Sequence, residues 1–200
     1  MKEAFTSLDE IEEFIWNQLE IAVSAGSHPW HVGVLASTSN EGPDARVVVL
    51  RGAERTTGTV TFHTDTRSLK WPQILTDNRV TWVFYDAPQA VQLRISGVAS
   101  PAPAEDAIKI WNAMPDRSMR SYATIQPPGA AQPNGGSGLG DEWRIGEPSK
   151  ADSAWMAPHF GVVRVIVQKF DFLHLRAAGH QRARWKLSPD SQWESTWVTP

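Results

Sequence analysis

The feature that most constrains the fold is a series of short β-branched segments in the first half of the chain. Each segment is rich in Val, Ile or Thr, and residues typical of turns separate it from the next. The segments cover residues 31–38, 45–51, 59–64, 80–85 and 90–99. Short strands at this spacing are typical of β-barrels and β-sandwiches. The pattern therefore predicts a mainly β fold.

Helices are predicted before and between these strands. Residues 7–26 place apolar side chains at helical spacing, with Ser7 as the N-cap and Glu10 completing a capping box. A short helix capped by Ser68 is expected between the third and fourth strands. An amphipathic helix buries one face, so we expect the first helix to pack against the sheet.

The second half of the chain adds two helices, a long loop and three more strands. The helices are predicted at 104–114 and at about 116–125, the loop at 126–150, and the strands at 160–175, 182–187 and 192–198. The loop is crowded with Pro, Gly and Ser, and a loop of this length is usually functional or mobile. The sequence therefore predicts a single domain over residues 1–200, a β-barrel with flanking helices.

Composition excludes several classes of function. Nineteen Lys and Arg against 22 Asp and Glu give a net charge of −3, which is unlike a general nucleic-acid or membrane-surface binder. There is no cysteine, and no histidine has an acidic partner at ligand spacing, so no metal site is expected. No apolar run approaches the roughly 18 residues that span a bilayer, and the acidic start is not a signal peptide. We expect a cytoplasmic protein that acts on a small molecule.

Two segments could bind an anion. In the strand at 45–51, Arg46 shares a face with Val48 and Leu50, where a charge is costly unless an anion meets it. An arginine at a strand end can equally extend to water. At 63–70, hydroxyl groups, two cations and a helix start gather in a pattern that suits a phosphate, but an ordinary capped helix shows it too. On these residues alone, both interpretations stay open.

Six motifs, taken in order, resemble those of the pyridoxamine 5′-phosphate oxidase family of FMN-binding split barrels. They are Arg-x-Val-x-Leu-basic at 46–51, aromatic-Thr-Asx-x-x-Ser-x-Lys at 63–70, Asn-Arg-Val at 78–80, Gln-x-Arg-Ile-x-Gly at 92–97, Trp-x-x-x-Pro at 111–115, and Phe-Gly-Val-Val-Arg-Val at 160–165 leading to Arg-Trp at 184–185. The resemblance runs from about residue 30 to the C-terminus. It implies a split β-barrel that holds FMN at the interface of a homodimer, with both protomers contributing to each site.

The resemblance also implies cofactor contacts. Arg46, Ser68 and Lys70 would hold the phosphate and ribityl chain of FMN. The backbone of Val47–Leu50 and of Thr64 would line the isoalloxazine edge, and Gln92 would hydrogen-bond the ring. From the second protomer, Gln126, Phe160 and Arg184 would close the site. The full set of predicted cofactor-binding residues is Arg46, Val47, Val48, Val49, Leu50, Arg51, His63, Thr64, Ser68, Lys70, Gln92, Gln126, Phe160 and Arg184.

The substrate side departs from the family pattern. The tyrosine and arginine that bind the substrate phosphate in the family align with Ile110 and Met114, whereas the serine is kept as Ser118. A phosphate dianion without those partners would lose much of its binding energy. The resemblance therefore implies an FMN-dependent oxidoreductase that is a functionally unassigned relative of the oxidase rather than the oxidase itself.

Two alternatives stay open. The chain could be a pyridoxamine or pyridoxine 5′-phosphate oxidase whose phosphate site is rebuilt from Arg51, Arg117 or Arg120. It could also be a non-catalytic protein that binds flavin or haem. For an enzyme, His180 and Arg182 are the candidate polar groups at the reacting face of the flavin.

Overall fold

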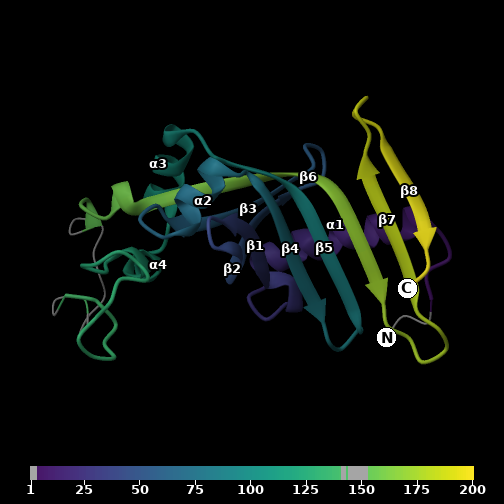
Figure 1. Ribbon diagram of the computed structural model, residues 1–200, viewed down its shortest axis with the longest axis horizontal. Coiled ribbons are helices and arrows are strands. Elements are labelled where there is room, and N and C mark those ends of the chain that lie inside the picture. Colours follow the sequence, from purple (N-terminus) through teal and green to yellow (C-terminus); the bar gives the residue numbers. More distant parts are fainter. Residues whose placement is uncertain (1–3, 141–142, 144–152) are drawn as a thin grey trace.

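A computed structural model of the protein describes residues 4–140, 143 and 153–200 (Figure 1). In these residues, eight antiparallel strands form one sheet in the order β3-β2-β1-β4-β5-β6-β7-β8, and β3 also pairs with β6. The strands are β1 (Val32–Ser39), β2 (Gly42–Glu54), β3 (Thr59–Asp65), β4 (Arg79–Asp86), β5 (Val91–Pro101), β6 (Phe160–His174), β7 (Gln181–Leu187) and β8 (Trp193–Val198). Because β3 meets β6, the first six strands close into a barrel. The predicted mainly β barrel is therefore confirmed.

The long strand β6 is part of both the barrel and the sheet that continues beyond it. Its first half pairs with β3, from Phe160 opposite Asp65 to Ile166 opposite Thr59. Its second half, from Lys169 onward, pairs with β7 instead, while β5 follows β6 along its other edge. The strands β7 and β8 therefore extend from the barrel as an arm, at the right of Figure 1.

The helices lie at the ends and sides of the barrel. They are α1 (Leu8–Ser24), η1 (Pro29–His31), α2 (Lys70–Thr76), α3 (Ala104–Ala113), α4 (Asp116–Met119), η2 (Arg120–Tyr122) and η4 (Ala157–His159). Helix α1 packs against β2 and buries Ile11, Ile15 and Leu19. As predicted, the Ser7 hydroxyl accepts a hydrogen bond from the Glu10 backbone N–H; the Glu10 carboxylate, however, accepts from the N–H of Thr6 rather than of Ser7.

Two clusters of buried side chains stabilise the fold. The larger fills the barrel and the space beneath α1, where Trp30, Trp82 and Trp185 are almost completely buried. The smaller centres on Trp111 and Phe160, at the end of the molecule where α3 and α4 lie. Burial of so many large rings makes packing, rather than ligand contact, the main use of the tryptophans.

Local structure differs from the prediction at two helices. Ser68 is not the cap of α2; Leu69 occupies the cap position, and the Ser68 hydroxyl donates to the Asp65 carbonyl at 2.7 Å within a tight turn. The helix predicted at about 116–125 is regular only to Met119, because the chain then tightens into the 3₁₀ turn that ends at Tyr122. Residues 141–142 and 144–150 of the predicted loop lie outside the described residues.

Candidate functional site

Within the residues that the structure describes, part of the β2 edge has no neighbouring strand. Residues 42–49 of β2 pair with β1, whereas pairing with β3 on the opposite edge begins only at Leu50. In the described chain, no other backbone group bonds to the free edge beside Val47 and Val49. Backbone N–H and C=O groups require partners, so this stretch can hydrogen-bond the polar rim of a ligand.

A chain of polar side chains lies where β3 ends and α2 begins. Lys70 Nζ donates to Ser68 Oγ at 3.0 Å, and Ser68 Oγ lies 3.3 Å from Thr64 Oγ1. Burial lowers the pKa of the Lys70 ammonium, and the nearby Arg46 guanidinium lowers it further. Lys70 makes no ion pair with any residue that the structure describes. A half-buried, unpaired cation beside two hydroxyls is a donor set that fits the phosphate of FMN.

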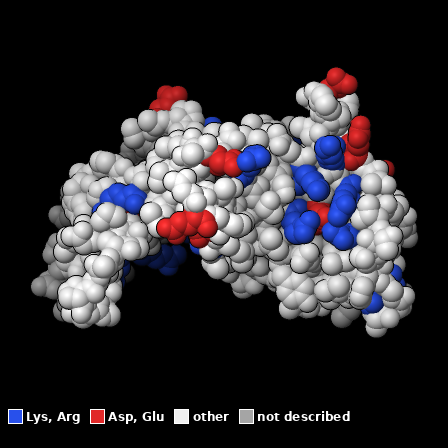
Figure 2. Space-filling view, in the orientation of Figure 1, with Lys and Arg blue, Asp and Glu red and all other residues white. Residues whose placement is uncertain are grey.

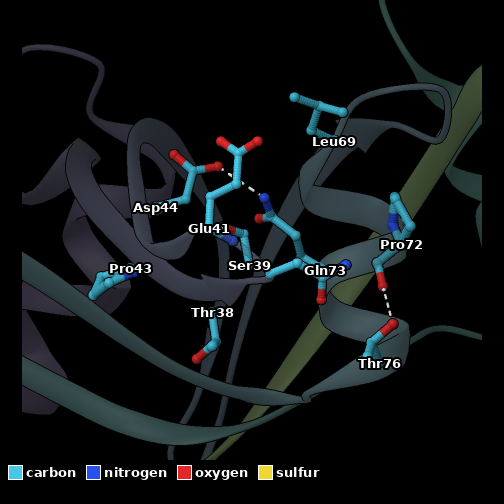
Figure 3. A pocket seen from close by; sticks show the side chains of 10 residues that line it. Thr38, Ser39, Glu41, Pro43, Asp44, Leu69, Pro72, Gln73 and Thr76 are labelled. Carbon is cyan, nitrogen blue, oxygen red and sulfur yellow. Dashed lines mark hydrogen bonds between the residues drawn. The ribbon is translucent and has the colours of Figure 1, made fainter.

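Arg46 is close to this group but is already engaged. Its Nη1 donates to Ser37 Oγ at 2.7 Å, and its Nη2 donates to Asp44 Oδ2 at 2.6 Å and to Gln73 Oε1 at 2.7 Å. The Gln73 amide also donates to Asp44 Oδ2 at 2.9 Å, as drawn in Figure 3. The anion that Arg46 meets in the structure is the carboxylate of Asp44, and an incoming phosphate must compete with that carboxylate.

The cavity shown in Figure 3 lies beside this network. It has a volume of about 600 Å³, and its walls include both Asp44 and Glu41. Two carboxylates at the rim of a cavity disfavour an anionic occupant. The phosphate-binding role therefore falls to the Lys70 side of α2 rather than to this cavity.

A second cavity, of about 510 Å³, carries positive charge. The residues that line this cationic cavity are Arg51, His63, Ile110, Ala113, Met114, Pro115, Arg117, Ser118, Ser121 and Tyr122. Neither arginine forms an ion pair with a described residue. Burial, reinforced by Arg51, lowers the pKa of the His63 imidazole to about 4, and burial raises the pKa of the Tyr122 hydroxyl. The cavity thus combines free guanidinium groups with neutral hydrogen-bonding groups and an apolar wall.

Phe160 does not lie where it was predicted to act. It is 5% exposed, and its ring contacts those of His63, Trp111 and Tyr122 at centroid distances of 4.9 to 5.5 Å. Arg184 lies opposite Asp171, at the far end of β6 from Phe160. At about 3.3 Å per residue, the two positions are roughly 35 Å apart along the strand. One protomer therefore cannot offer both side chains to one flavin, and we omit Phe160 from the proposed site.

The remaining predicted residues are spread over the surface. Gln92 lies in β5 opposite Tyr85, on the face of the sheet that points away from the core. Arg182 and Arg184 share that face and donate to Asp171. Gln126 is exposed, and His180 lies in the turn before β7, where its Nδ1 accepts from the Arg176 N–H. These residues do not gather with Lys70 in one protomer.

Comparison with known proteins agrees with this geometry. Residues 14–102 match the family described as pyridoxamine 5′-phosphate oxidase, FMN-binding domain. Residues 14–102 of this chain are therefore similar to the FMN-binding domain of the pyridoxamine 5′-phosphate oxidases. The resemblance predicted from the motifs is thereby confirmed, and so is FMN as the cofactor of the matched domain. No curated protein matches the chain significantly in sequence.

Solved structures share the fold of this chain. A pyridoxamine 5′-phosphate oxidase-related FMN-binding protein of Nostoc punctiforme is 22% identical, with a TM-score of 0.76 over 98% of this chain and 100% of that chain. PhzG from Burkholderia lata, solved with tetrahydrophenazine-1-carboxylic acid, is 20% identical, with a TM-score of 0.66 over 86% and 83% of the two chains. At these identities the likeness shows the fold.

The structure also bears on metals and membranes. Within residues 4–140, 143 and 153–200, no three His, Asp or Glu side chains gather as metal ligands. None of the helices in those residues has the length and apolar character needed to cross a bilayer.

Sequence reasoning missed two carboxylates, Asp44 and Asp171. Asp44 precedes Arg46 by two positions in a strand, so their shared face could have been inferred from alternation. Asp171 meets its arginines through the register of β5, β6 and β7, which the sequence pattern does not define.

Proposed function

We propose that the chain is an FMN-dependent oxidoreductase. The observation that carries this proposal is the free edge of β2 beside the Thr64–Ser68–Lys70 group, because it joins backbone donors and acceptors to an unpaired cation. Lys70 and Ser68 would hold the FMN phosphate, and the backbone of Val47–Leu50 would bind the edge of the ring. When bound, FMN supplies two-electron transfer, while the protein orients the ring and sets the charge around it.

We infer further that the protein acts as a homodimer. Val32, Val34 and Val47 form a valine patch that is exposed on the outer face of β1 and β2, with Val34 directly opposite Val47. Val47 alone is 64% exposed, although it lies in the middle of a strand. Exposed valines in a contiguous patch mark an interaction site, and a second copy placed here would cover the free edge of β2. FMN would then lie between the two protomers.

The cationic cavity is the proposed binding site for the substrate. Arg51 and Arg117 suit an organic anion, and Ile110 and Met114 suit an apolar ring beside it. The ligand solved in PhzG, a fused ring system carrying one carboxylic acid group, belongs to this chemical class. A monoanionic aromatic acid is therefore the substrate class that we favour.

A second candidate function is the oxidation of pyridoxamine 5′-phosphate. It is favoured by one observation, namely that Arg51, Arg117 and Ser118 line the same cavity. Formation of pyridoxal 5′-phosphate by the FMN-loaded protein distinguishes the two candidates. We expect no turnover above background, and clear turnover that disappears in Arg117→Ala would make the second candidate correct.

The cofactor assignment is tested on the purified protein. The bound pigment is released by denaturation, identified by mass and absorption, and titrated back onto the apoprotein. We expect FMN at one equivalent per chain and reduction of the loaded protein by a two-electron donor. A colourless protein that also fails to bind added FMN would overturn the proposal.

A further inference from the structure

A buried carboxylate holds three arginines on the outer face of the sheet. Asp171 is 2% exposed, and it accepts hydrogen bonds from Arg182 Nε at 2.9 Å, Arg182 Nη2 at 3.0 Å, Arg184 Nε at 2.9 Å and Arg94 Nη2 at 3.1 Å. Although burial acts to raise the pKa of Asp171, the bonds from Arg182 and Arg184 lower it overall. The carboxylate is therefore ionised at neutral pH. We call these four residues the arginine cluster.

The strand register explains why the cluster faces outward. Asp171 lies directly opposite Arg94 in β5 and Arg184 in β7, while the neighbouring Phe170 points into the core. Figure 2 shows basic side chains gathered around one acidic group over β5 to β7, at the right of the view. Lys169 in β6 and Lys186 in β7 lie opposite each other. They are two positions from Asp171 and Arg184 and on the same face of the sheet.

The arginine cluster carries more positive charge than its one carboxylate can neutralise. One arginine neutralises one carboxylate, so Asp171 with three arginines leaves a net charge of about +2. The surplus guanidinium groups repel one another and stay together only through their shared acceptor. In the described residues, the Nη atoms of Arg184 and Nη1 of Arg182 have no partner. These N–H groups can donate hydrogen bonds to an anionic group or another acceptor outside the protomer.

The cluster also continues the face that carries the valine patch. Val34 of the patch pairs with Val83 in β4, Val83 pairs with Arg94 in β5, and Arg94 pairs with Asp171. A copy that covers the valine patch therefore docks on the same face of the sheet that carries the arginines. In the proposed homodimer, this shared face would set the arginine cluster of one protomer beside the site of the other.

We propose that Asp171 is a positioning residue that aims Arg182 and Arg184 at the flavin bound to the partner copy. This inference rests on the proposed function, in which FMN lies between two protomers. Asp171 does not touch the cofactor; it keeps the two guanidinium groups together and their free N–H groups pointing outward. Positive charge held beside the ring favours the reduced, more negative flavin.

The test is the reduction potential of FMN bound to Asp171→Asn. If Asp171 contributed only its charge, its removal would leave three positive charges and raise the potential. If it positions the arginines, their repulsion spreads them, the potential falls, and FMN binds about tenfold more weakly. We expect the fall. A potential that rises or stays unchanged would overturn the inference.

Controls separate positioning from general damage. Asp86→Asn removes another buried carboxylate, whose partner is Gln89 rather than an arginine, and we expect it to leave the potential unchanged. Arg184→Gln tests separately whether this guanidinium lies beside the flavin, and it should also lower the potential. The Nε–H resonances of Arg182 and Arg184 give a readout that needs no FMN. They should be protected from exchange in the wild type and lose protection in Asp171→Asn; equal protection would overturn the inference even if the protein binds no flavin.

Discussion

Arg46 and Asp44 form an ion pair of 2.6 Å at the point where the family resemblance places a phosphate. Both side chains come from the same face of β2, and Gln73 of α2 bonds to each of them. Through Gln73, the ion pair links α2 to β2 at the end of the barrel. It also sets a carboxylate in competition with any phosphate that approaches Arg46.

Replacing Asp44 with Asn should tighten the binding of FMN. The change removes the competing negative charge and keeps an oxygen that Arg46 and Gln73 can bond, so we expect a decrease in the Kd of FMN of about three- to tenfold. Titration with riboflavin, which lacks the phosphate, is the control. An equal change for both flavins would show that Asp44 does not act through the phosphate.

Replacing Lys70 with Ala should weaken the binding of FMN. The substitution deletes the unpaired cation beside Ser68, and a charge-assisted hydrogen bond contributes about 1.5–3 kcal/mol, so the Kd should rise at least tenfold. Lys109→Ala, at an exposed lysine of α3, is the matched control for loss of one positive charge. If both variants bind FMN like the wild type, the phosphate site is placed wrongly.

A charge in the valine patch should separate the protomers. Val34→Asp would bury an unpaired carboxylate in the proposed interface, which costs several kcal/mol, so we expect monomers that lose FMN. Light scattering after size-exclusion chromatography measures the mass, and Ile21→Asp on the exposed side of α1 is the control. A wild-type protein that is already monomeric would contradict the dimer.

His63 should make stability fall in mild acid. Its folded-state pKa of about 4 lies below the ordinary value of 6.5, so between these values the unfolded chain binds a proton that the folded chain does not. The contribution is constant above pH 6.5 and is lost progressively as the pH falls toward 4, by at most about 3 kcal/mol. Urea unfolding of the wild type and of His63→Phe at pH 7.5 and pH 4.5 should show the smaller loss in the variant. Equal losses would mean that the imidazole is protonated in the folded state.

Much of the barrel could be predicted from the sequence because its strands alternate so regularly. In β4, β-branched and aromatic residues point alternately inward and outward, and the turns between strands carry Gly, Pro and Asp. The cap of α1 could be predicted for a similar reason, since a serine followed three residues later by a glutamate is a local signal. Such short-range patterns need no tertiary information.

The site could be predicted only in part, because its key relations are long-range. The motif at 63–70 predicted Lys70 and Ser68 as phosphate-binding residues, and it also predicted Ser68 as the cap of the following helix. In the structure, the Ser68 hydroxyl instead donates to the Asp65 carbonyl within a turn. Phe160 and Arg184 were assigned to one flavin from the family resemblance, although the strands predicted at 160–175 and 182–187 already separate them along the hairpin. The role of Ser68 is decided by a local turn, whereas the residues that lie opposite one another in β5, β6 and β7 depend on the packed structure.

The dual pairing of β6 has a consequence for how the protein is made. On the ribosome, residues 32–101, which include both β3 and β5, emerge before β6. Each of these strands keeps one bare edge until Phe160 and the residues after it have been synthesised. An exposed edge invites pairing with another chain, so the interval before β6 appears is when the nascent protein is most prone to aggregate. A message cut short before the codon for Phe160 would leave both edges permanently open.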